Sequence, residues 1–272
     1  MSHFDPLASV HAGAKLGKDV TVGPFAVIEE GAEIGDGCVI GPHVLVTRWA
    51  RLGKEVKLAK GVVVGTDPQD LKFAGEETTA HVGDRTVIRE FVTVNRGTTY
   101  HMKTVVGADC LLLAYSHIAH DCIIGDHVIL DNAVQLAGHV EIGDWVIIGG
   151  LSGVQQFVHI GAHAFIGGKC GVRKDVPPFI KAAGEPLVFA GTNNIGLARR
   201  GFDKERITAI QQAYRTLYRS GLLFKDAVEK LKSDASTPDV EEIIRFIENR
   251  SKHGVIGGQR NRRSFEQNPD EE

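Results

Sequence analysis

The sequence is poor in aromatic residues and contains neither a long apolar run nor a large net charge. Phe, Trp and Tyr together make up 7% of its 272 residues, so the core cannot rest mainly on large rings. No stretch of about eighteen apolar residues occurs, which predicts no membrane span. The first thirty residues lack a basic segment followed by an apolar one, so we expect no secretory signal and a cytoplasmic protein. The net charge of −3 argues against a nucleic-acid partner, because nothing global attracts phosphate.

Glycine and a six-residue repeat are what the sequence has in abundance. Every sixth residue is a large aliphatic one over residues 10–64, 82–94 and 106–172, and a small residue often stands four positions later. Neither a helical nor a two-residue strand period explains this spacing. It predicts a parallel β-solenoid whose stacked coils bury one apolar column. The cysteines occupy the small inward position, which favours buried hydrophobes over disulfides: Cys38, Cys110, Cys122 and Cys170.

Residues 66–81 and 99–104 interrupt the repeat without changing its phase. We expect both to loop out from the solenoid, where they either carry function or are tolerated surface insertions. Pro177–Pro178 stops the repeat. The predicted domains are a β-solenoid over 1–183, a helical domain over 184–256 that caps the solenoid or binds substrate, and a disordered tail over 257–272.

The helical domain is predicted from amphipathic segments and their caps. Asp203 is the expected N-cap of a first helix that ends at Gly221. Two more helices are expected over 224–233 and 238–250, the latter opened by Thr237–Pro238. The buried stripe of the first helix is expected to contain Ile207, Ile210, Tyr214 and Leu217.

The histidines point to a ligand site on the solenoid. The repeat resembles that of the hexapeptide-repeat family, which implies a left-handed β-helix with eighteen residues per coil. Residues eighteen apart then stack at about 4.8 Å, which places Asp121 next to His139 and Gly138 over His120. Gly138 leaves room for a ligand there or exposes its N–H. The whole cluster comprises His117, His120, Asp121, His139 and Gln156.

The chemistry expected of this cluster is proton transfer. A neutral imidazole accepts a proton near pH 7, and an adjacent carboxylate orients the ring. His120 is therefore the candidate general base and Asp121 its partner. No Ser-His-Asp arrangement or nucleophilic Cys is evident, which favours direct attack by a substrate on an activated acyl group.

Six strings along the chain resemble the UDP-N-acetylglucosamine acyltransferase family, whose members begin lipid A synthesis. They are QDLKFAGE (69–76), IREFVTVNRGT (88–98), HIAHDCIIGD (117–126), LAGHVEIGD (136–144), QFVHIGAHAFIGG (156–168) and RRGFDKERITAI (199–210). The similarity spans nearly the whole chain. It implies transfer of a 3-hydroxyacyl group from acyl carrier protein (acyl-ACP) to the 3-hydroxyl of UDP-N-acetylglucosamine. It also implies that no metal or cofactor takes part, and that the protein is a homotrimer with its sites between solenoids.

The resemblance further implies roles for individual residues. His120 would act as the base on the sugar hydroxyl with Asp121 as partner, and the N–H of Gly138 would stabilise the oxyanion. Residues that would contact the sugar nucleotide, the acyl donor or both are Asp70, Lys72, His117, His139 and Gln156. The uridine diphosphate would be held by Asn193, Arg199 and Arg200. Gly168 matches the position that limits acyl length, and its lack of a side chain implies a groove open to a longer chain.

Two departures from the family leave alternatives open. Asn95 and Gln155 stand where histidines are expected, so the acceptor could instead be a 3-amino UDP-sugar, giving an amide.

Two other classes of protein are further alternatives. One is a zinc hydratase resembling the γ-class carbonic anhydrases, with His81, His117 and His120 as zinc ligands. The helical domain and the strings quoted above would then be unexplained. A non-enzymatic scaffold is the third alternative.

Overall fold

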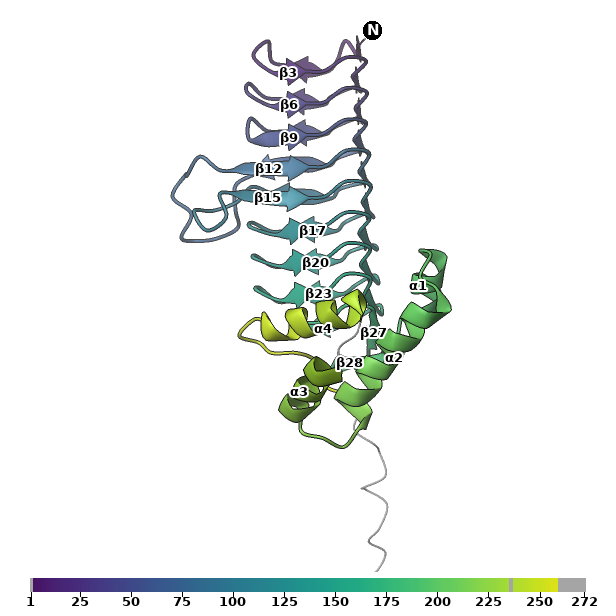
Figure 1. The fold of residues 1–272 in the computed structure, drawn as a ribbon. Helices are drawn as coiled ribbons and strands as arrows, with labels where there is room; N and C mark the ends of the chain where they lie inside the picture. The colour runs from purple at the N-terminus through teal and green to yellow at the C-terminus, as the bar shows by residue number, and fades with distance from the viewer. Residues whose placement is uncertain (1, 235–236, 259–272) are drawn as a thin grey trace, which may run out of the picture.

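The computed structural model describes residues 2–234 and 237–258, which form a three-sided β-helix with α-helices at its C-terminal end (Figure 1). Each coil contributes one short strand to each of three sheets, and the strands from successive coils pair in parallel. The prediction of a left-handed parallel β-helix followed by a small helical domain is confirmed.

The strands are numbered along the chain and fall into three sheets. Sheet 1 contains β1 (His3–Phe4), β4 (Thr21–Val22), β7 (Val39–Ile40), β10 (Lys57–Leu58), β13 (Val87–Ile88), β16 (Leu111–Leu112), β19 (Ile129–Leu130), β22 (Ile147–Ile148), β25 (Phe165–Ile166), β27 (Ile180–Ala183) and β28 (Val188–Thr192). Sheet 2 contains β2 (Ser9–Val10), β5 (Val27–Ile28), β8 (Leu45–Val46), β11 (Val63–Thr66), β14 (Thr93–Asn95), β17 (His117–Ile118), β20 (Gln135–Leu136), β23 (Gly153–Val154) and β26 (Gly171–Val172). Sheet 3 contains β3 (Lys15–Leu16), β6 (Glu33–Ile34), β9 (Ala50–Leu52), β12 (Thr79–Val82), β15 (Lys103–Val106), β18 (Ile123–Ile124), β21 (Glu141–Ile142) and β24 (His159–Ile160).

The core is the predicted column of inward-pointing aliphatic residues. Partners in neighbouring coils are eighteen residues apart, as in the pairing of His117 with Gln135. Ile118, Leu130 and most other residues of this phase are almost fully buried, while Val10 and Leu16 in the first coil are partly buried. Each full burial stabilises the fold by about 1.5–3 kcal/mol. All four cysteines are buried and free, which confirms that they serve as small core residues.

The two interruptions keep the phase of the repeat, but they are shorter or shifted relative to the prediction. Residues 67–78 and 96–102 are the loops, because Thr79–Val82 and Lys103–Val106 pair as strands β12 and β15. Both loops leave the corner between sheets 2 and 3 and project together from the β-helix, on the left in Figure 1.

Arg96 ties these two loops together. Its side chain is only 5% exposed, and it donates to the Asp67 carboxylate at 2.8 Å and to the main-chain oxygen of Glu76. The guanidinium also lies over the rings of Trp49 and Phe73, at 4.6 and 4.7 Å from their centroids. A buried cation with this many partners fixes both loops against the solenoid.

The chain leaves the last coil through an antiparallel hairpin, β27–β28, which crosses the predicted domain boundary at residue 183. Four helices follow: α1 (Asn194–Arg199), α2 (Lys204–Arg219), α3 (Phe224–Asp234) and α4 (Pro238–Glu248). The hairpin and α1 were not predicted from the sequence. The other three helices were predicted correctly, although α2 and α4 each end two residues earlier than predicted.

The predicted helix caps and the buried stripe of α2 are present. The Asp203 side chain accepts from the N–H of Arg206, and the Thr237 side chain accepts from the N–H of Val240. Such caps satisfy N–H groups that have no partner within the helix. The buried stripe of α2 contains Ile210, Tyr214 and Leu217, with Ile207 partly buried beside it.

After α4 the chain returns to the last coils of the β-helix. Ser251 donates its hydroxyl to the buried Asp175 carboxylate at 2.8 Å, and the N–H of Phe189 donates to Gly257 at 3.0 Å. Gly257 and Gly258, predicted to open a disordered tail, are therefore joined to the hairpin. The rest of that predicted tail, 259–272, lies outside the described residues.

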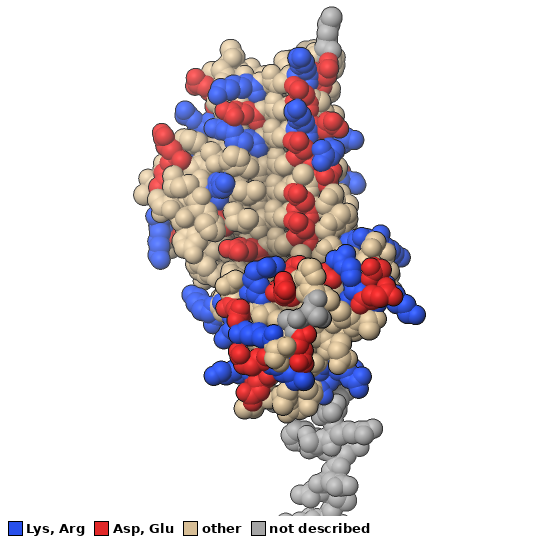
Figure 2. All heavy atoms as spheres, viewed as in Figure 1, with Lys and Arg blue, Asp and Glu red and all other residues tan. Residues whose placement is uncertain are grey.

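Charges of both signs are mixed on the face of the molecule shown in Figure 2, and they are densest over the helices at the C-terminal end. No extended surface of one sign is present on that face. In the described part of the chain, no helix combines the length and apolar character needed to cross a membrane.

Candidate functional site

The candidate site lies at the corner between sheets 2 and 3, termed the His120 corner. Successive coils turn there on Asp121, His139 and Phe157, each with a φ near +60°. Asp and His tolerate this left-handed conformation better than most residues. The rings of His139 and Phe157 stack in parallel with centroids 4.3 Å apart. The eighteen-residue spacing therefore brings Asp121 and His139 together, as the sequence predicts.

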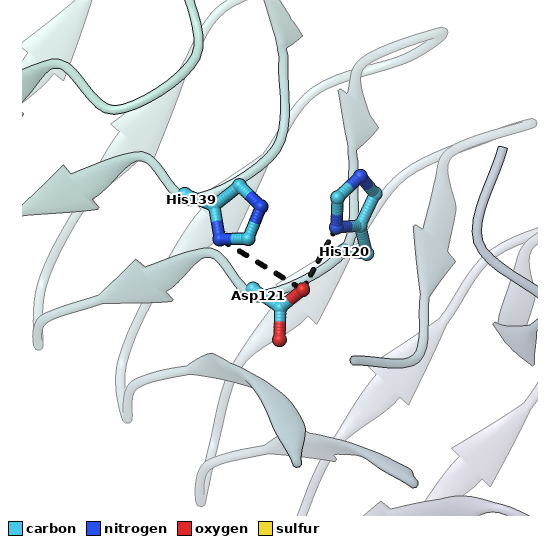
Figure 3. A group of neighbouring side chains, drawn as sticks. All are labelled: His120, Asp121 and His139. Carbon is cyan, nitrogen blue, oxygen red and sulfur yellow. Dashed lines mark hydrogen bonds and ion pairs between the residues drawn. The ribbon is translucent and has the colours of Figure 1, made fainter. Parts of the chain in front are cut away.

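Asp121 lies between two histidine rings (Figure 3). Its Oδ2 atom is 2.8 Å from Nδ1 of His120, which is a hydrogen bond, and 3.9 Å from Nδ1 of His139, which is too far for one. Nδ1 of His139 is buried and has no hydrogen-bond partner among the described residues. Asp121 is thus hydrogen-bonded to His120, while its interaction with His139 is electrostatic only.

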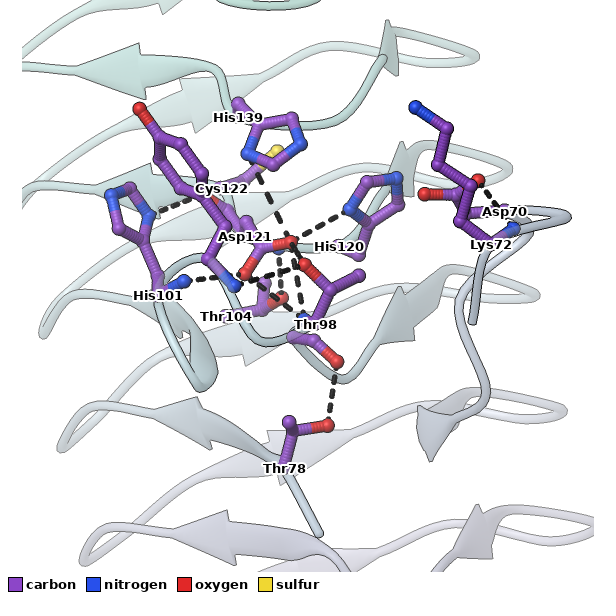
Figure 4. A network of polar contacts seen from close by, with 12 residues as sticks. Asp70, Lys72, Thr78, Thr98, His101, Thr104, His120, Asp121, Cys122 and His139 are labelled. Atoms are coloured by element: carbon purple, nitrogen blue, oxygen red, sulfur yellow. Dashed lines mark hydrogen bonds and ion pairs between the residues drawn. The ribbon is translucent and has the colours of Figure 1, made fainter. Parts of the chain in front are cut away.

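The second insertion loop encloses the Asp121 carboxylate (Figure 4). Thr98 donates its hydroxyl at 2.6 Å and its N–H at 3.0 Å, and the N–H of His101 donates at 3.0 Å. Burial alone would raise the pKa of Asp121, but hydrogen bonds from His120, Thr98 and His101 outweigh it and hold the pKa well below its usual range. Asp121 is therefore ionised at neutral pH.

Gly138 lies directly over His120. A Cβ atom at this position would stand 2.6 Å from Cε1 and 2.7 Å from Nε2 of His120, so only glycine leaves the ring in place. The open space beside it forms a groove of roughly 580 Å³ along the outer face of sheet 2. The groove is lined by Gln69, His117, Ala119, His120, Gln135, Leu136, Ala137, Gly138, Gly153, Val154, Gln155, Gln156, Gly171, Val172 and Arg173.

His117 and Gln156 lie in this groove with His120, as predicted. Nδ1 of His117 is 2.7 Å from the Thr93 hydroxyl. Burial lowers the pKa of His117, as does the nearby His120. Burial likewise lowers the pKa of His139, and Asp121 opposes that change. Both rings are therefore held neutral near pH 7 and can hydrogen-bond to a ligand without carrying charge.

The first insertion loop brings Asp70 and Lys72 toward the same corner. Gln69 of this loop lines the groove, and the Asp70 carboxylate is near enough to His139 to raise its pKa slightly. Figure 4 shows Asp70 and Lys72 on the loop next to His120. The N–H of Lys72 donates to the Asp70 carboxylate at 3.0 Å, which shapes the turn.

The residues predicted to hold a uridine diphosphate lie at a different corner, between sheets 3 and 1. This corner, termed the His163 corner, stacks His127, Trp145, His163 and Phe179. Asn193 donates to the main-chain oxygen of His163 at 2.9 Å, and Arg200 lies 5.2 Å from the Trp145 ring centroid. Arg199 is exposed at the end of α1. A single chain does not bring these three residues to His120.

Three other positions singled out in the sequence have distinct surroundings. Gly168 is exposed in the turn after β25 and is not among the residues that line the groove of this chain. Asn95 is buried: its amide donates to Thr66, and its Oδ1 has no partner in the described part of the chain. Gln155 lines the groove and lies 3.5 Å from Nδ1 of His253, which comes from the returning C-terminal segment.

The zinc ligands of the alternative reading are not brought together. His81 lies on sheet 3 with its Nε2 bound to the Thr79 hydroxyl, whereas His117 lies on sheet 2. Within residues 2–234 and 237–258, a cluster with metal-ligand geometry does exist at His120, Asp121 and His139. Its central carboxylate oxygen is already hydrogen-bonded to His120.

The six-residue repeats of this β-helix place the chain in the class of hexapeptide-repeat transferases. Residues 13–48 and 103–134 match the family described as bacterial transferase hexapeptide (six repeats). Residues 175–256 match the family described as UDP N-acetylglucosamine O-acyltransferase, domain 2.

Similarity to individual proteins extends over almost the whole chain. An acyl-acyl-carrier-protein–UDP-N-acetylglucosamine O-acyltransferase from Chlorobaculum parvum is 55% identical over 91% of this chain and 94% of its own length. One of the same description from Halorhodospira halophila is 46% identical over 94% and 100%. The crystal structure of a UDP-N-acetylglucosamine acyltransferase from Bacteroides fragilis superposes with a TM-score of 0.90 at 42% identity, covering 93% of this chain and 99% of that one. The chain belongs to the acyl-acyl-carrier-protein–UDP-N-acetylglucosamine O-acyltransferase family of enzymes.

Proposed function

We propose that this enzyme transfers a 3-hydroxyacyl group from acyl-ACP to the 3-hydroxyl of UDP-N-acetylglucosamine, the first step of lipid A synthesis, with His120 as general base. The observation that carries the proposal is the His120–Asp121 pair, which lies under Gly138 in a groove of a chain similar to such transferases along nearly its whole length. The groove is lined mostly by uncharged residues, with Arg173 as the exception, and such a lining suits an acyl chain.

The chemical step follows from the geometry. Nε2 of His120 accepts the proton of the sugar hydroxyl as its oxygen attacks the thioester carbonyl carbon. The carbonyl oxygen becomes an oxyanion, which the N–H of Gly138 stabilises, and one such donor contributes about 3 kcal/mol. When the tetrahedral intermediate collapses, the carbon–sulfur bond breaks, and the leaving thiolate of the carrier takes the proton from His120. Asp121, ionised throughout, stabilises the imidazolium between these two transfers.

Direct attack is favoured over a covalent acyl-enzyme because, among the described residues, no activated nucleophile lies beside His120. Cys122 is two residues away, but its side chain is fully buried and points inward. Burial raises the pKa of its thiol to about 12, so almost no thiolate is present at neutral pH.

We further propose a homotrimer in which a neighbouring chain completes each site. Asn193 and Arg200 lie at the His163 corner, so they can act on the substrate of His120 only if they come from another copy. The surface on which a second copy could pack is apolar. The outer face of sheet 1 carries Val87, Leu111, Ile129, Ile147 and Phe165, and its border with sheet 2 exposes Phe25, Phe91, Tyr115 and Leu151. A contiguous apolar surface of this kind marks an interface in a water-soluble protein.

The acceptor is tested by assaying the purified protein with 3-hydroxyacyl-ACP of several chain lengths against UDP-N-acetylglucosamine and its 3-amino analogue. We expect an alkali-labile ester of the hydroxyl sugar, detected by mass spectrometry, with one preferred acyl length. An amide formed only with the amino sugar would reject the hydroxyl acceptor and support the alternative. Failure of both sugars with every donor would reject the proposed function.

The shared site is tested by combining two defective chains. His120→Ala chains should be inactive and Arg200→Ala chains should have a raised KM for the UDP-sugar, but trimers that contain both include interfaces where both native residues meet. Co-expression should therefore yield a fraction of sites with the native KM, which neither chain shows alone. Native mass spectrometry should give three times the 29.4 kDa of one chain. A monomer that is fully active would overturn this part of the proposal.

A further inference from the structure

The position of Asp121 depends on a loop that lies outside the six-residue repeat. The carboxylate is completely buried, and its Oδ1 atom accepts N–H groups from Thr98 and His101, each at 3.0 Å. Oδ2 accepts the Thr98 hydroxyl at 2.6 Å and pairs with Nδ1 of His120 at 2.8 Å. The main-chain N–H of Asp121 donates to Thr104 at 2.8 Å. Thr98 is thus the only one of these residues that contacts both carboxylate oxygens.

The polarity of these bonds fixes where the proton of His120 resides. An ionised carboxylate only accepts hydrogen bonds, so the Thr98 hydroxyl must donate to it, and Nδ1 of His120 must carry a proton to do the same. Nε2 of His120 then has a free lone pair, and it lies on the side of Gly138 and the groove. The same arrangement keeps a catalytic imidazole in the tautomer that accepts a proton from substrate.

The loop that carries Thr98 is itself firmly anchored. Two residues earlier, the buried Arg96 binds Asp67 and Glu76 of the first loop, and the Thr78 hydroxyl donates to the main-chain oxygen of Gly97. The hydroxyl of Thr98 also accepts from the N–H of Tyr100 at 3.3 Å. Thr98 therefore meets Asp121 from a fixed position, as a group that orients a reacting residue must.

We propose that Thr98 is a positioning residue of the acyl transfer: its hydroxyl and N–H hold the Asp121 carboxylate so that His120 keeps its proton on Nδ1 and presents Nε2 to the acceptor. The inference rests on the proposed role of His120 as general base. It assigns to the second insertion loop a part in the reaction, although no atom of Thr98 needs to touch substrate.

The test compares Thr98→Val, which keeps the shape and loses the hydroxyl, with Thr98→Ser, which keeps the hydroxyl. We expect Thr98→Val to lower kcat by about ten- to a hundredfold, the loss typical of one hydrogen bond to a charged group. The KM of both substrates should change by less than about twofold, because the contact acts on the transition state and not on binding. Thr98→Ser should restore kcat to within a few fold.

Thr86→Val is the matched control. Thr86 is buried, whereas Thr98 is half-buried, and the hydroxyl of Thr86 likewise donates once and accepts once, but its partners are Gly107 and Cys110, away from the site. The Thr86→Val enzyme should be less stable than the native enzyme and keep the native kcat.

Three outcomes would overturn the inference. One is a kcat of Thr98→Val within about twofold of the native enzyme while His120→Ala is inactive. A second is an equal loss of kcat in Thr98→Ser and Thr98→Val. The third outcome is a His120 that carries its proton on Nε2 instead of Nδ1. Nitrogen-15 NMR of the histidines in the native protein measures this, and it tests the inference even if Thr98→Val does not fold. A native enzyme without acyl transfer would instead reject the proposed function, which keeps the two failures distinct.

Discussion

The His120 corner and the His163 corner are built from the same turn, yet they have become different kinds of site. At both, successive coils turn on residues with positive φ, and aromatic rings stack one over the next. At the His120 corner a buried carboxylate is hydrogen-bonded to the imidazole. At the His163 corner the nearest charged partner is Arg200, 3.5 Å from the ring nitrogen.

The difference arises from what packs against each corner from outside the coils. The second insertion loop brings Thr98 and His101 to Asp121, and their hydrogen bonds keep the carboxylate ionised. The helical domain brings Arg200 to His163; burial first, and then this cation, lowers the pKa of that histidine to about 4. Under the proposed function, one corner accepts a proton and the other presents a cation to an anionic ligand. In this β-helix the coils carry His120, Asp121 and Gly138, and the segments outside the coils set the hydrogen bonding and the charge around each corner.

The largest effect should come from removing the imidazole at the His120 corner. His120→Ala should lower kcat by about a hundred- to ten-thousandfold, the usual contribution of a general base, with the melting temperature nearly unchanged because the side chain is not part of the core. Steady-state kinetics with acyl-ACP measures the effect, and His43→Ala in the N-terminal coils is the control. Near-native kcat in a folded His120→Ala enzyme would show that the base is another residue.

A smaller loss is expected from crowding the same ring. Gly138→Ala should lower kcat by about a hundredfold, since its Cβ would displace His120 while the N–H proposed to stabilise the oxyanion remains. Gly257→Ala is the matched control, because nothing lies within 4 Å of an added Cβ there. Equal kcat in the two variants would contradict the close approach of Gly138 to His120.

The His163 corner should respond in binding rather than in chemistry. Arg200→Ala should raise the KM for the UDP-sugar by about tenfold and leave kcat nearly unchanged, as expected when a charged hydrogen bond to the ground state is lost. Arg219→Ala, at the far end of α2, is the control for charge alone. A large fall in kcat with unchanged KM would assign Arg200 to the reaction instead.

The smallest expected effect is a pH dependence of stability. The pKa of His163 is about 4 in the folded protein, below that of an unfolded histidine at about 6.5. The unfolded chain therefore binds the proton first as the pH falls, and stability is lost between about pH 6.5 and pH 4. His163→Phe, which keeps an aromatic ring in the stack, should remove a loss in the free energy of unfolding on the order of 1 kcal/mol over this window, seen as a flatter dependence of the melting temperature on pH. An unchanged pH slope would contradict the depressed pKa.

The fold was predictable wherever the repeat holds its phase. The six-residue spacing gave the coils, the inward cysteines and the stacking of Gly138 on His120. It failed after Pro178, where hairpin β27–β28 is antiparallel and α1 is only six residues long. A helix that short has too weak a periodic pattern to be seen in a sequence.

From spacing alone, the site was predictable only where its members lie on the coils; Asp70 and Lys72 of the first insertion loop came from the family resemblance. Asp121 and His139 are eighteen residues apart, so their contact follows from the repeat. Thr98 and His101 are 23 and 20 residues from Asp121, because the insertion changes the spacing and hides the contact from any fixed period. Thr98 does fall within the quoted string 88–98, which was the one available signal for it.

The burial of the four cysteines has a practical consequence for labelling experiments. All are buried, and burial raises the pKa of the Cys110 and Cys122 thiols to about 11 and about 12, so the native surface offers almost nothing to a maleimide dye. Leu71, fully exposed between Asp70 and Lys72, is a place to introduce a thiol without removing a native one. A fluorophore attached through Leu71→Cys would then be the sole label on each chain and would report directly on whatever enters the groove beside it.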